Sequence, residues 1–443
     1  MRNCGVSAMG DASRVRYSIL AMLFLVTSLN YADRATLSIA GPDLAKQLGL
    51  SAVAMGYIFS AFGWAYVAGQ IPGGLLLDRF GSKNVYTLSI LAWSAVTLLQ
   101  GSVGRCPASV AVVVLFSLRL VLGLAESPSF PANSRIVAAW FPTPERGTAA
   151  AIFNSAQYFS TVLFAPLTGW ITHALGWQYV FLVMGGLGML LIVPWRNIVY
   201  NPREHPRIKR AELHWIEQGG GLVDMDRAPG AGPRQSGPQW FYLKQLLANR
   251  MLLGVYIGQY CITTLTYFFL TWFPVYLVQG RGMSILTAGF VASLPALCGF
   301  FGGVVGGLFS DFMLHRGWSL AAARKTPIVL GMLLSVSMIA CNYVRADWMV
   351  VGIMSLAFLG KGIGSLGWAV VSDTSPKQSA GLSGGLFNMF GNTAAITTPI
   401  VIGYIVEGTG SFRGALVFVA ANALTAIICY LVVVGEIKRV EFR

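Results

Sequence analysis

A carboxylate and a guanidinium lie side by side within a long apolar stretch near the N-terminus. Asp33 and Arg34 follow the apolar run 17–29 and precede six more residues with a helical pattern, 35–40. Either charge costs roughly 2.5 to 3.5 kcal/mol near the centre of a membrane helix. Neighbouring residues on a helix point about 100° apart, so these two side chains cannot simply neutralise each other. We expect each to have its own partner or a wet cavity; an Arg34 side chain that extends to the headgroups at a helix end is the alternative.

Arg119 and Glu126 are a second pair of charges within an apolar stretch. Seven residues make two helical turns, about 10 Å, so both side chains lie on one face and can approach each other or share a water. One interpretation is a structural ion pair. The other is a protonatable switch, because burial favours a neutral carboxyl whereas a nearby guanidinium favours the charged form. A pair that is made in one conformation and broken in another would take up and release a proton.

The composition indicates that membrane helices must position these charges. Of the 443 residues, 55% are hydrophobic and 11% are charged, whereas soluble domains have about 25% charged residues. These values predict a polytopic protein of the lipid bilayer. The net charge of +14 does not indicate a nucleic-acid partner, because the cationic residues flank apolar spans and form no compact basic domain.

The cysteines and histidines indicate neither a metal site nor a disulfide framework. The six cysteines are scattered, without a C-x-x-C motif or Cys/His ligand spacing: Cys4, Cys106, Cys261, Cys298, Cys341 and Cys429. The histidines are placed in loops or at span ends: His173, His205, His214 and His315. Nothing resembles a set of nucleophile and base or an H-E-x-x-H motif. We therefore expect no metal, no cofactor and no enzyme.

Apolar segments long enough to cross a bilayer, about 20 residues each, occur twelve times. They are 17–40, 52–77, 84–103, 109–131, 147–170, 176–199, 251–278, 286–310, 326–343, 347–371, 380–404 and 413–435. We therefore expect an all-α membrane protein with an N-terminal six-helix bundle (1–200), a cytoplasmic linker loop (201–250) and a C-terminal six-helix bundle (251–443). The loop is basic at its start and rich in glycine and proline at 229–238, which predicts a short amphipathic piece and a flexible linker.

The distribution of lysine and arginine predicts the orientation. With the N-terminus in the cytoplasm, 23 of the 31 cationic side chains fall on that side. The opposite side receives Lys46, Arg105, Arg281, Arg345 and Arg413, and three lie within spans: Arg34, Arg119 and Lys361. We expect both termini to face the cytoplasm.

A short motif occurs twice, at 73–78 (GGLLLD) and 306–311 (GGLFSD), at the ends of the second and eighth spans. This repeat indicates two related bundles, a common plan among transporters. The first copy resembles the cytoplasmic loop motif of the major facilitator superfamily, G-x-x-x-D-R-x-G-[RK]-[RK], and departs from it at Ser82. The matching residues are Gly74, Asp78, Arg79, Gly81 and Lys83. A carboxylate at a helix end that faces cations could latch the bundles together on the inside, as a gate; an ordinary charged turn is the alternative.

A closer resemblance links the chain to the anion:cation symporter branch of that superfamily, and within it to bacterial glucarate/galactarate (hexarate) permeases and their galactonate relatives. It is carried by 30–40, 56–74, 119–147, 153–159 and 366–392, runs nearly end to end, and is weakest in the middle loop. The resemblance implies a bacterial inner-membrane transporter that imports hexarates with protons by alternating access. It implies protonation roles for Glu126 and Asp33, and binding of the sugar-acid carboxylate by Arg34.

Uncharged polar residues that the resemblance assigns to the substrate site are Tyr31, Tyr66, Gln157, Gln259, Ser365, Trp368 and Asn388, with Asn392 as a weaker addition. Amides and phenols can bind the hydroxyls of a polyhydroxy acid, and an indole face can cover its C–H groups. Individually, such side chains also serve as hydrogen-bonding contacts between membrane helices.

Lys361 places an ammonium among glycines, seven residues before Trp368 and on the same helical face. A monocarboxylate needs one cation, whereas a hexarate has a carboxylate at each end. We hypothesise that Arg34 and Lys361 each bind one carboxylate, so that the substrate ties the bundles together. A lysine that extends to the headgroups or packs between helices is the alternative. Two protons per dianion would leave the net charge of the core unchanged.

Other functional classes stay open at this stage. A non-transporting sensor of the same fold is one alternative. A uniporter or an anion exchanger for related sugar acids, hexonates or hexuronates, is another. We expect a monomer, and the sequence does not settle the preferred hexarate, the proton stoichiometry or the oligomeric state.

Overall fold

The computed structural model describes residues 14–143, 145–226, 239–376 and 380–441, and their regular structure is helical throughout. Eleven helical segments in this part of the chain are long and apolar enough to cross a membrane. The helix α6, Arg146–Leu175, is 30 residues long and adds a twelfth path that is more polar, because Asn154, Ser155 and Gln157 interrupt its apolar residues. The all-helical membrane fold predicted from the sequence is confirmed.

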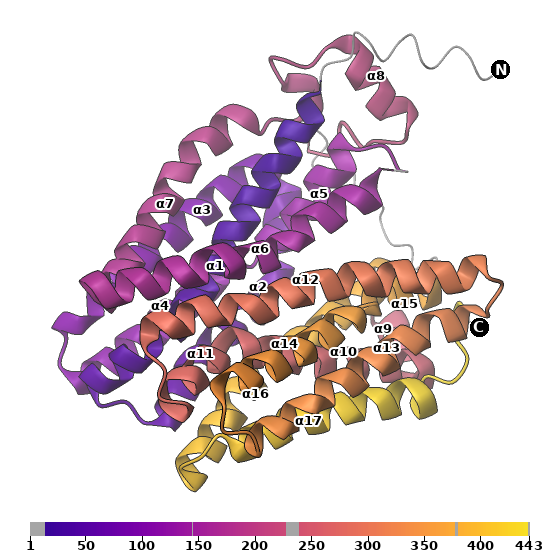
Figure 1. The fold of residues 1–443 in the computed structure, drawn as a ribbon. Helices are drawn as coiled ribbons and strands as arrows, with labels where there is room; N and C mark the ends of the chain where they lie inside the picture. Colours follow the sequence, from indigo (N-terminus) through magenta and orange to yellow (C-terminus); the bar gives the residue numbers. More distant parts are fainter. Residues whose placement is uncertain (1–13, 144, 227–238, 377–379, 442–443) are drawn as a thin grey trace.

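The helices form two groups, which Figure 1 shows in indigo to magenta and in orange to yellow. The first half contains α1 (Val15–Leu48), α2 (Ala52–Phe80), α3 (Ser82–Gln100), α4 (Ala108–Glu126), α5 (Ser129–Trp140), α6 and α7 (Trp177–Ile198). The second half contains α10 (Arg250–Tyr267), α11 (Phe273–Val275), α12 (Ile285–His315), α13 (Leu320–Val336), α14 (Asp347–Ile363), α15 (Gly367–Thr374), α16 (Ala380–Thr409) and α17 (Arg413–Ile428). The short helices α8 (Arg210–Gln218) and α9 (Gln239–Ala248) lie between them in sequence.

The predicted fourth span, 109–131, is interrupted where α4 ends and α5 begins. Pro128 has no N–H to continue the helical ladder. The hydroxyl of Ser127 donates to the carbonyl oxygens of Leu124 (2.8 Å) and Gly69 (3.0 Å), which compensates the break. The first span is longer than predicted, because α1 continues through Pro42 to Leu48.

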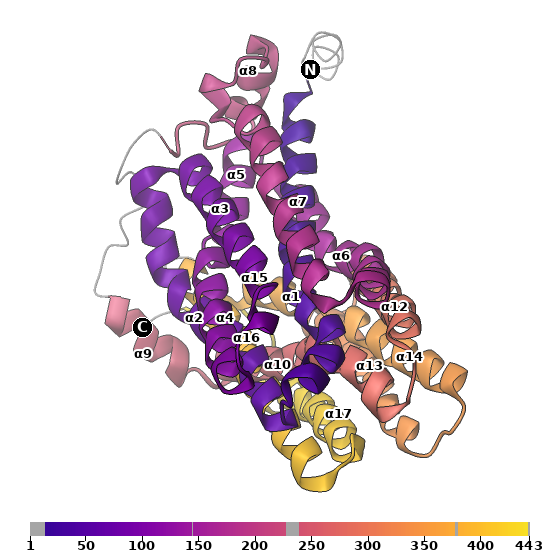
Figure 2. The same cartoon turned by 90° about the vertical axis from the view of Figure 1, so that its left-hand side faces the viewer.

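The two halves pack closely at the end of the helices opposite the predicted cytoplasmic face. A Cβ on Gly56 would lie 2.6 Å from the Pro399 oxygen, and one on Gly169 would lie 3.1 Å from the Gly289 Cα. Small residues allow such close approach of helix backbones. Toward the other end the ribbons of the two halves diverge (Figures 1 and 2). Among the described residues, α2 and α16 are joined by a hydrogen bond from Asn388 to Gln70, which lies closer to the predicted cytoplasmic end than the contact at Gly56.

The middle loop packs onto the predicted cytoplasmic end of the first half as far as residue 226. The Glu212 carboxylate accepts hydrogen bonds from the backbone N–H groups of Val15 and Arg16, both at 3.1 Å. Figure 2 shows α8 beside the start of α1, and α9 packs against α10 of the second half. The segment 229–238, predicted to be a flexible linker, lies outside the described residues, as does the start of the chain.

Candidate functional site

Arg34 on α1 forms a buried ion pair with Glu126 at the end of α4. The Arg34 Nε to Glu126 Oε2 distance is 2.8 Å, and the side chains are 4% and 0% exposed. The guanidinium carbon also lies 4.7 Å from the ring centroids of Tyr31, Phe62 and Tyr66. Aromatic faces attract a cation that has lost its water. Three rings and one carboxylate therefore stabilise the Arg34 charge inside the first half.

The expected contact between Arg119 and Glu126 is not formed. Glu126 pairs with Arg34 instead, and among the described residues no ion pair within 4.0 Å links Arg119 to a carboxylate. The Arg119 guanidinium carbon lies 5.7 Å from the Phe62 ring centroid. Two turns of α4 separate Arg119 from Glu126 (about 10 Å), whereas Arg34 reaches Glu126 directly from a neighbouring helix. The direct ion pair is therefore absent in this conformation, and the proton-coupling role of Arg119 and Glu126 stays a prediction.

Several buried polar atoms around this ion pair have no hydrogen-bond partner within the described part of the chain. They are both carboxylate oxygens of Asp33, Nε and Nη1 of Arg119, Nη2 of Arg34 and Oε1 of Glu126. Buried polar atoms are paired in the great majority of native structures, so these charged groups are open to a further polar partner. Asp33 and Arg119 are 2% exposed each.

A small pocket lies between the two halves, next to this cluster. Its polar lining comes from α1 and α6 of the first half and from α10 and α14 of the second: Tyr31, Gln157, Tyr158, Thr161, Thr266 and Lys361. Tyr31 lines the pocket while its ring covers Arg34, so the ion pair and the pocket adjoin.

Lys361 lies on the opposite wall of this pocket, near the C-terminal end of α14. It is 5% exposed, and its ammonium lies 3.4 Å from the Tyr158 hydroxyl. The ring centroids of Phe358 and Tyr158 are 5.2 and 5.5 Å away. No carboxylate of the described residues lies within 4.0 Å of it. Lys361 is therefore buried at the pocket between the two halves, and its role in binding a carboxylate stays a prediction.

Asn388 connects the two halves. Its Nδ2 donates to Gln70 Oε1 on α2 at 3.0 Å, and its Oδ1 accepts from Asn392 at 3.0 Å. Asn392 in turn accepts from the Tyr267 hydroxyl at 3.0 Å. Asn388 is thus committed to a bond between the halves in this conformation.

Six of the nine residues predicted to bind the substrate do not line the pocket in this conformation: Arg34, Tyr66, Gln259, Ser365, Trp368 and Asn388. Gln259 donates to Thr263 Oγ1 at 3.1 Å, and Ser365, which lies between α14 and α15, donates to the Gly362 backbone oxygen of α14 at 2.6 Å. Trp368 is 56% exposed and packs edge-on against Phe387, with 4.8 Å between ring centroids. The substrate-binding roles of all nine residues stay predictions.

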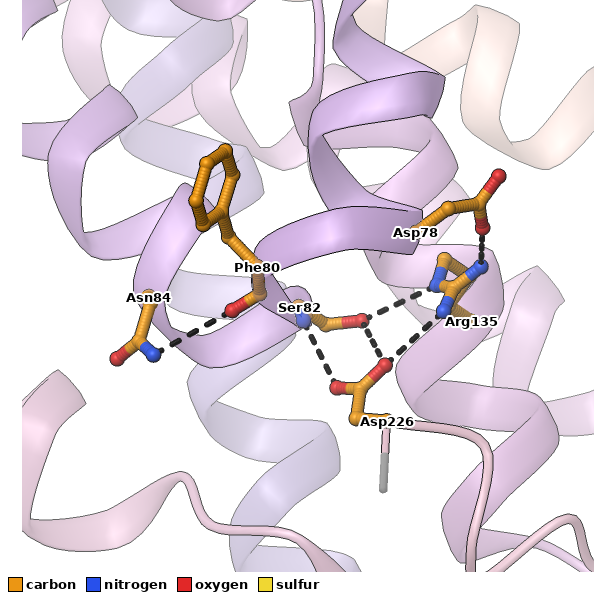
Figure 3. A network of polar contacts seen from close by, with 6 residues as sticks. All are labelled: Asp78, Phe80, Ser82, Asn84, Arg135 and Asp226. Carbon is orange, nitrogen blue, oxygen red and sulfur yellow. Dashed lines mark hydrogen bonds and ion pairs between the residues drawn. The ribbon is translucent and has the colours of Figure 1, made fainter. Parts of the chain in front are cut away.

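The motif at the end of α2 and the start of α3 forms a polar network with α5 and the middle loop (Figure 3). Arg135 of α5 donates to Asp78, and to Asp226 of the middle loop at 3.0 Å. Asp226 also accepts from the backbone N–H of Ser82 at 2.8 Å and from its hydroxyl at 3.2 Å. Gly81 has φ +77°, a conformation that favours glycine. The carboxylate of Asp78 therefore faces a cation of its own half, and the latch between the bundles stays a prediction.

The remaining motif residues lie around this network. The Lys83 ammonium lies 3.3 Å from the Tyr200 ring centroid, and the Arg79 guanidinium carbon lies 5.2 Å from that of Phe80. A Cβ on Gly74 would meet nothing within 4 Å.

The second copy of the motif has a similar arrangement. Arg324 lies between Asp311, at 3.9 Å, and Asp373, at 2.9 Å. Each half thus places one guanidinium between two carboxylates near its predicted cytoplasmic end.

Three residues of these contacts were not predicted from the sequence: Tyr158 at the pocket, Gln70 at Asn388 and Asp226 at Arg135. Tyr158 follows Gln157 in a polar part of α6, and Gln70 lies one turn after Tyr66, so their positions offered a signal. Asp226 offered none, because its partners come from distant segments.

The chain is similar to known proteins in family, in sequence and in fold. Residues 23–323 match the family model described as Major Facilitator Superfamily. The Bacillus subtilis (strain 168) protein named "Probable galactarate/D-glucarate transporter GudP" is 66% identical over 438 residues, which cover 99% of this chain and 96% of that protein. The "D-galactonate transporter" of Escherichia coli O6:H1 is 40% identical over 429 residues, covering 96% of this chain and 97% of that protein. The crystal structure of a D-xylose-proton symporter shares the fold, with a TM-score of 0.71 at 14% identity over 95% of this chain and 98% of that chain.

Proposed function

We propose that this chain, which belongs to the major facilitator superfamily, imports sugar diacids such as galactarate and D-glucarate together with protons. Membership of a transporter family makes it a multi-pass membrane transporter and not an enzyme. The names of its bacterial relatives supply the substrate class. Direction, proton coupling, alternating access and a place in the bacterial inner membrane are our proposal.

The observation that carries the proposal is the buried pair of Arg34 and Glu126 beside a pocket between the two halves. A guanidinium binds a carboxylate through charge-assisted hydrogen bonds. Here the Arg34 guanidinium already donates to the protein's own Glu126 carboxylate, with 2.8 Å from Nε to Oε2. Any carboxylate ligand of Arg34 must therefore compete with Glu126, and the state of Glu126 decides the outcome.

Protonation of Glu126 removes this competition. The neutral carboxyl no longer holds Arg34 by an ion pair, so the guanidinium turns to the substrate carboxylate. Loss of the proton restores the internal pair and expels the substrate. Asp33 supplies the second protonation site in this proposal.

The charge balance of the buried groups supports two protons per dianion. Three cations, Arg34, Arg119 and Lys361, face two carboxylates, Asp33 and Glu126, which gives a net charge of +1 when both carboxylates are charged. With both protonated and a dianion bound, the net charge is again +1. Because the empty and the loaded core carry the same net charge, loading the substrate adds no cost of burying charge in the dehydrated core.

The remaining polar residues bind the substrate hydroxyls in our proposal. Tyr31 and Gln157 line the pocket already, and Tyr66 covers Arg34. Gln259, Ser365, Trp368 and Asn388 join when the second half moves, since Asn388 is held by Gln70 in the present conformation. No cofactor is required, and we propose that the monomer is the working unit.

Rocking of the two halves about the pocket would expose it to either side in turn. The tight glycine contacts close the end opposite the cytoplasm, so this conformation suits exchange with the cytoplasm. Movement in the other sense would bring the Asp78 motif of the first half toward the second half.

The test uses purified protein in liposomes with an imposed pH gradient and labelled galactarate. We expect uphill accumulation that requires an acidic exterior, with two protons taken up per substrate. Arg34→Ala should abolish both accumulation and counterflow. Accumulation without a pH gradient, driven by an internal anion, would instead favour an exchanger, and downhill flux alone would favour a uniporter.

A further inference from the structure

Lys361 is a buried cation for which the described part of the protein provides no counterion. Its side chain is 5% exposed and borders the pocket, and its hydrogen-bond partner is the Tyr158 hydroxyl at 3.4 Å. A lone ammonium inside a membrane protein is costly, so its retention indicates that an anion meets it. Lys361 lies in the last turn of α14, where the negative end of the helix dipole favours a cation. This lowers the cost of burying the ammonium but does not remove it.

Tyr158 reaches Lys361 from the other half of the molecule. It lies on α6, whereas Lys361 lies on α14. Aromatic contacts fix the Tyr158 ring, with centroids 6.3 Å from both Phe300 and Phe358. The hydroxyl accepts from the ammonium and keeps its own proton free to donate. The ammonium and the phenol thus provide two donors at one point of the pocket wall.

We infer that Lys361 and Tyr158 form the binding site for the second carboxylate of a sugar diacid, and that this site selects diacids over monoacids of the same length. The inference rests on the proposed function, which places the first carboxylate at Arg34. Tyr31 links the two ends, because it lines the pocket with Lys361 and covers Arg34 at 4.7 Å.

Selectivity follows from what a monoacid leaves behind. Galactonate carries a hydroxymethyl group where galactarate carries its second carboxylate. With galactonate bound, Lys361 would stay without a counterion, and the hydroxymethyl group would offer the ammonium only a neutral partner. A site built to bind a charged group rejects the analogue that lacks it, because the site's own buried charge stays unpaired.

The same geometry makes the diacid a bridge. One carboxylate would bind the first half at Arg34. The other would bind Lys361 of the second half and Tyr158 of α6 in the first half. A diacid therefore stabilises the approach of α6 and α14 more than a monoacid does.

The test compares the binding of galactarate and galactonate to purified protein by calorimetry at one pH. Lys361→Met and Tyr158→Phe remove the charge and the hydroxyl with little change in volume, and Lys361→Arg restores a cation. Lys325→Met is the matched control, since Lys325 contacts the backbone oxygen of Gly435 at the predicted cytoplasmic end. Thermal unfolding without ligand checks that each variant folds.

We expect Lys361→Met to weaken galactarate binding by about 10- to 100-fold, the worth of a buried charged hydrogen bond, and to leave galactonate binding unchanged. Tyr158→Phe should weaken galactarate binding by about 3- to 10-fold, and Lys361→Arg should keep much of the preference for galactarate. Lys325→Met should behave as the wild type.

Equal loss of both ligands in Lys361→Met, or no loss, overturns the inference while leaving the proposed function intact. A wild-type protein that binds neither ligand overturns both. A wild-type protein that binds both equally overturns the selectivity claim alone.

Discussion

Replacing Glu126 with glutamine tests whether this residue competes with the substrate for Arg34. Glutamine keeps the size and an oxygen acceptor but has no charge, so it imitates the protonated carboxyl. The Arg34 to Glu126 bond is 2.8 Å long and both side chains are buried, so solvent does not screen it. A hydrogen bond with a charged partner contributes about 1.5 to 3 kcal/mol, and a neutral one about 0.5 to 1.5 kcal/mol.

The difference, about 1 to 2 kcal/mol, is the advantage that a substrate carboxylate gains when the competitor loses its charge. It corresponds to roughly 5- to 30-fold tighter binding at a pH where wild-type Glu126 is charged. We also expect the pH dependence of binding to flatten in Glu126→Gln, because one group that titrates on binding is gone. Stability without ligand should fall by a similar amount.

Binding of galactarate at pH 6 and pH 8 gives the readout, with transport in liposomes beside it. Uphill accumulation should be lost in Glu126→Gln, whereas counterflow of labelled substrate should remain. Glu145→Gln is the control, because Glu145 pairs with Arg16 at 3.2 Å and is 31% exposed. If Glu126→Gln still accumulates galactarate on an imposed pH gradient, the coupling role argued for this pair is refuted.

Three further predictions concern the packing of the two halves and the motif network. Gly56→Val should open the contact of α2 with α16, because its Cβ would lie 2.6 Å from the Pro399 oxygen. Overpacking costs about 1 to 3 kcal/mol, and labelling of a cysteine introduced at that end of α16 should increase; unchanged labelling would contradict this. Asp226→Asn should loosen the middle loop by weakening its bond to Arg135 and the cap on α3, by about 1 to 2 kcal/mol; proteolysis of the loop should become faster, and an unchanged rate would contradict this. Gly81→Ala should lower thermal stability by about 1 to 3 kcal/mol, since φ is +77°; an unchanged melting temperature would show that the turn adjusts.

The sequence alone determined the helical class, the spans and the repeated plan. In a bilayer each helix must satisfy its own backbone hydrogen bonds, so length and apolarity within one segment are enough to predict it. The charges Arg34, Glu126 and Lys361 could be identified for the same reason, since a charge within an apolar span stands out locally. Span ends were less certain, as α1 and the break at Pro128 show, because they depend on neighbouring helices.

Only the tertiary structure decided which charges meet. Glu126 pairs with Arg34, 92 positions away, and not with Arg119 on its own helix. Lys361 meets Tyr158 across 203 positions, and Ser82 meets Asp226 across 144. Spacing along one helix gives the face on which a side chain lies, but the partner depends on which helix packs against that face. Contacts between segments so far apart in the chain are set by the packing of whole helices, which no local pattern encodes.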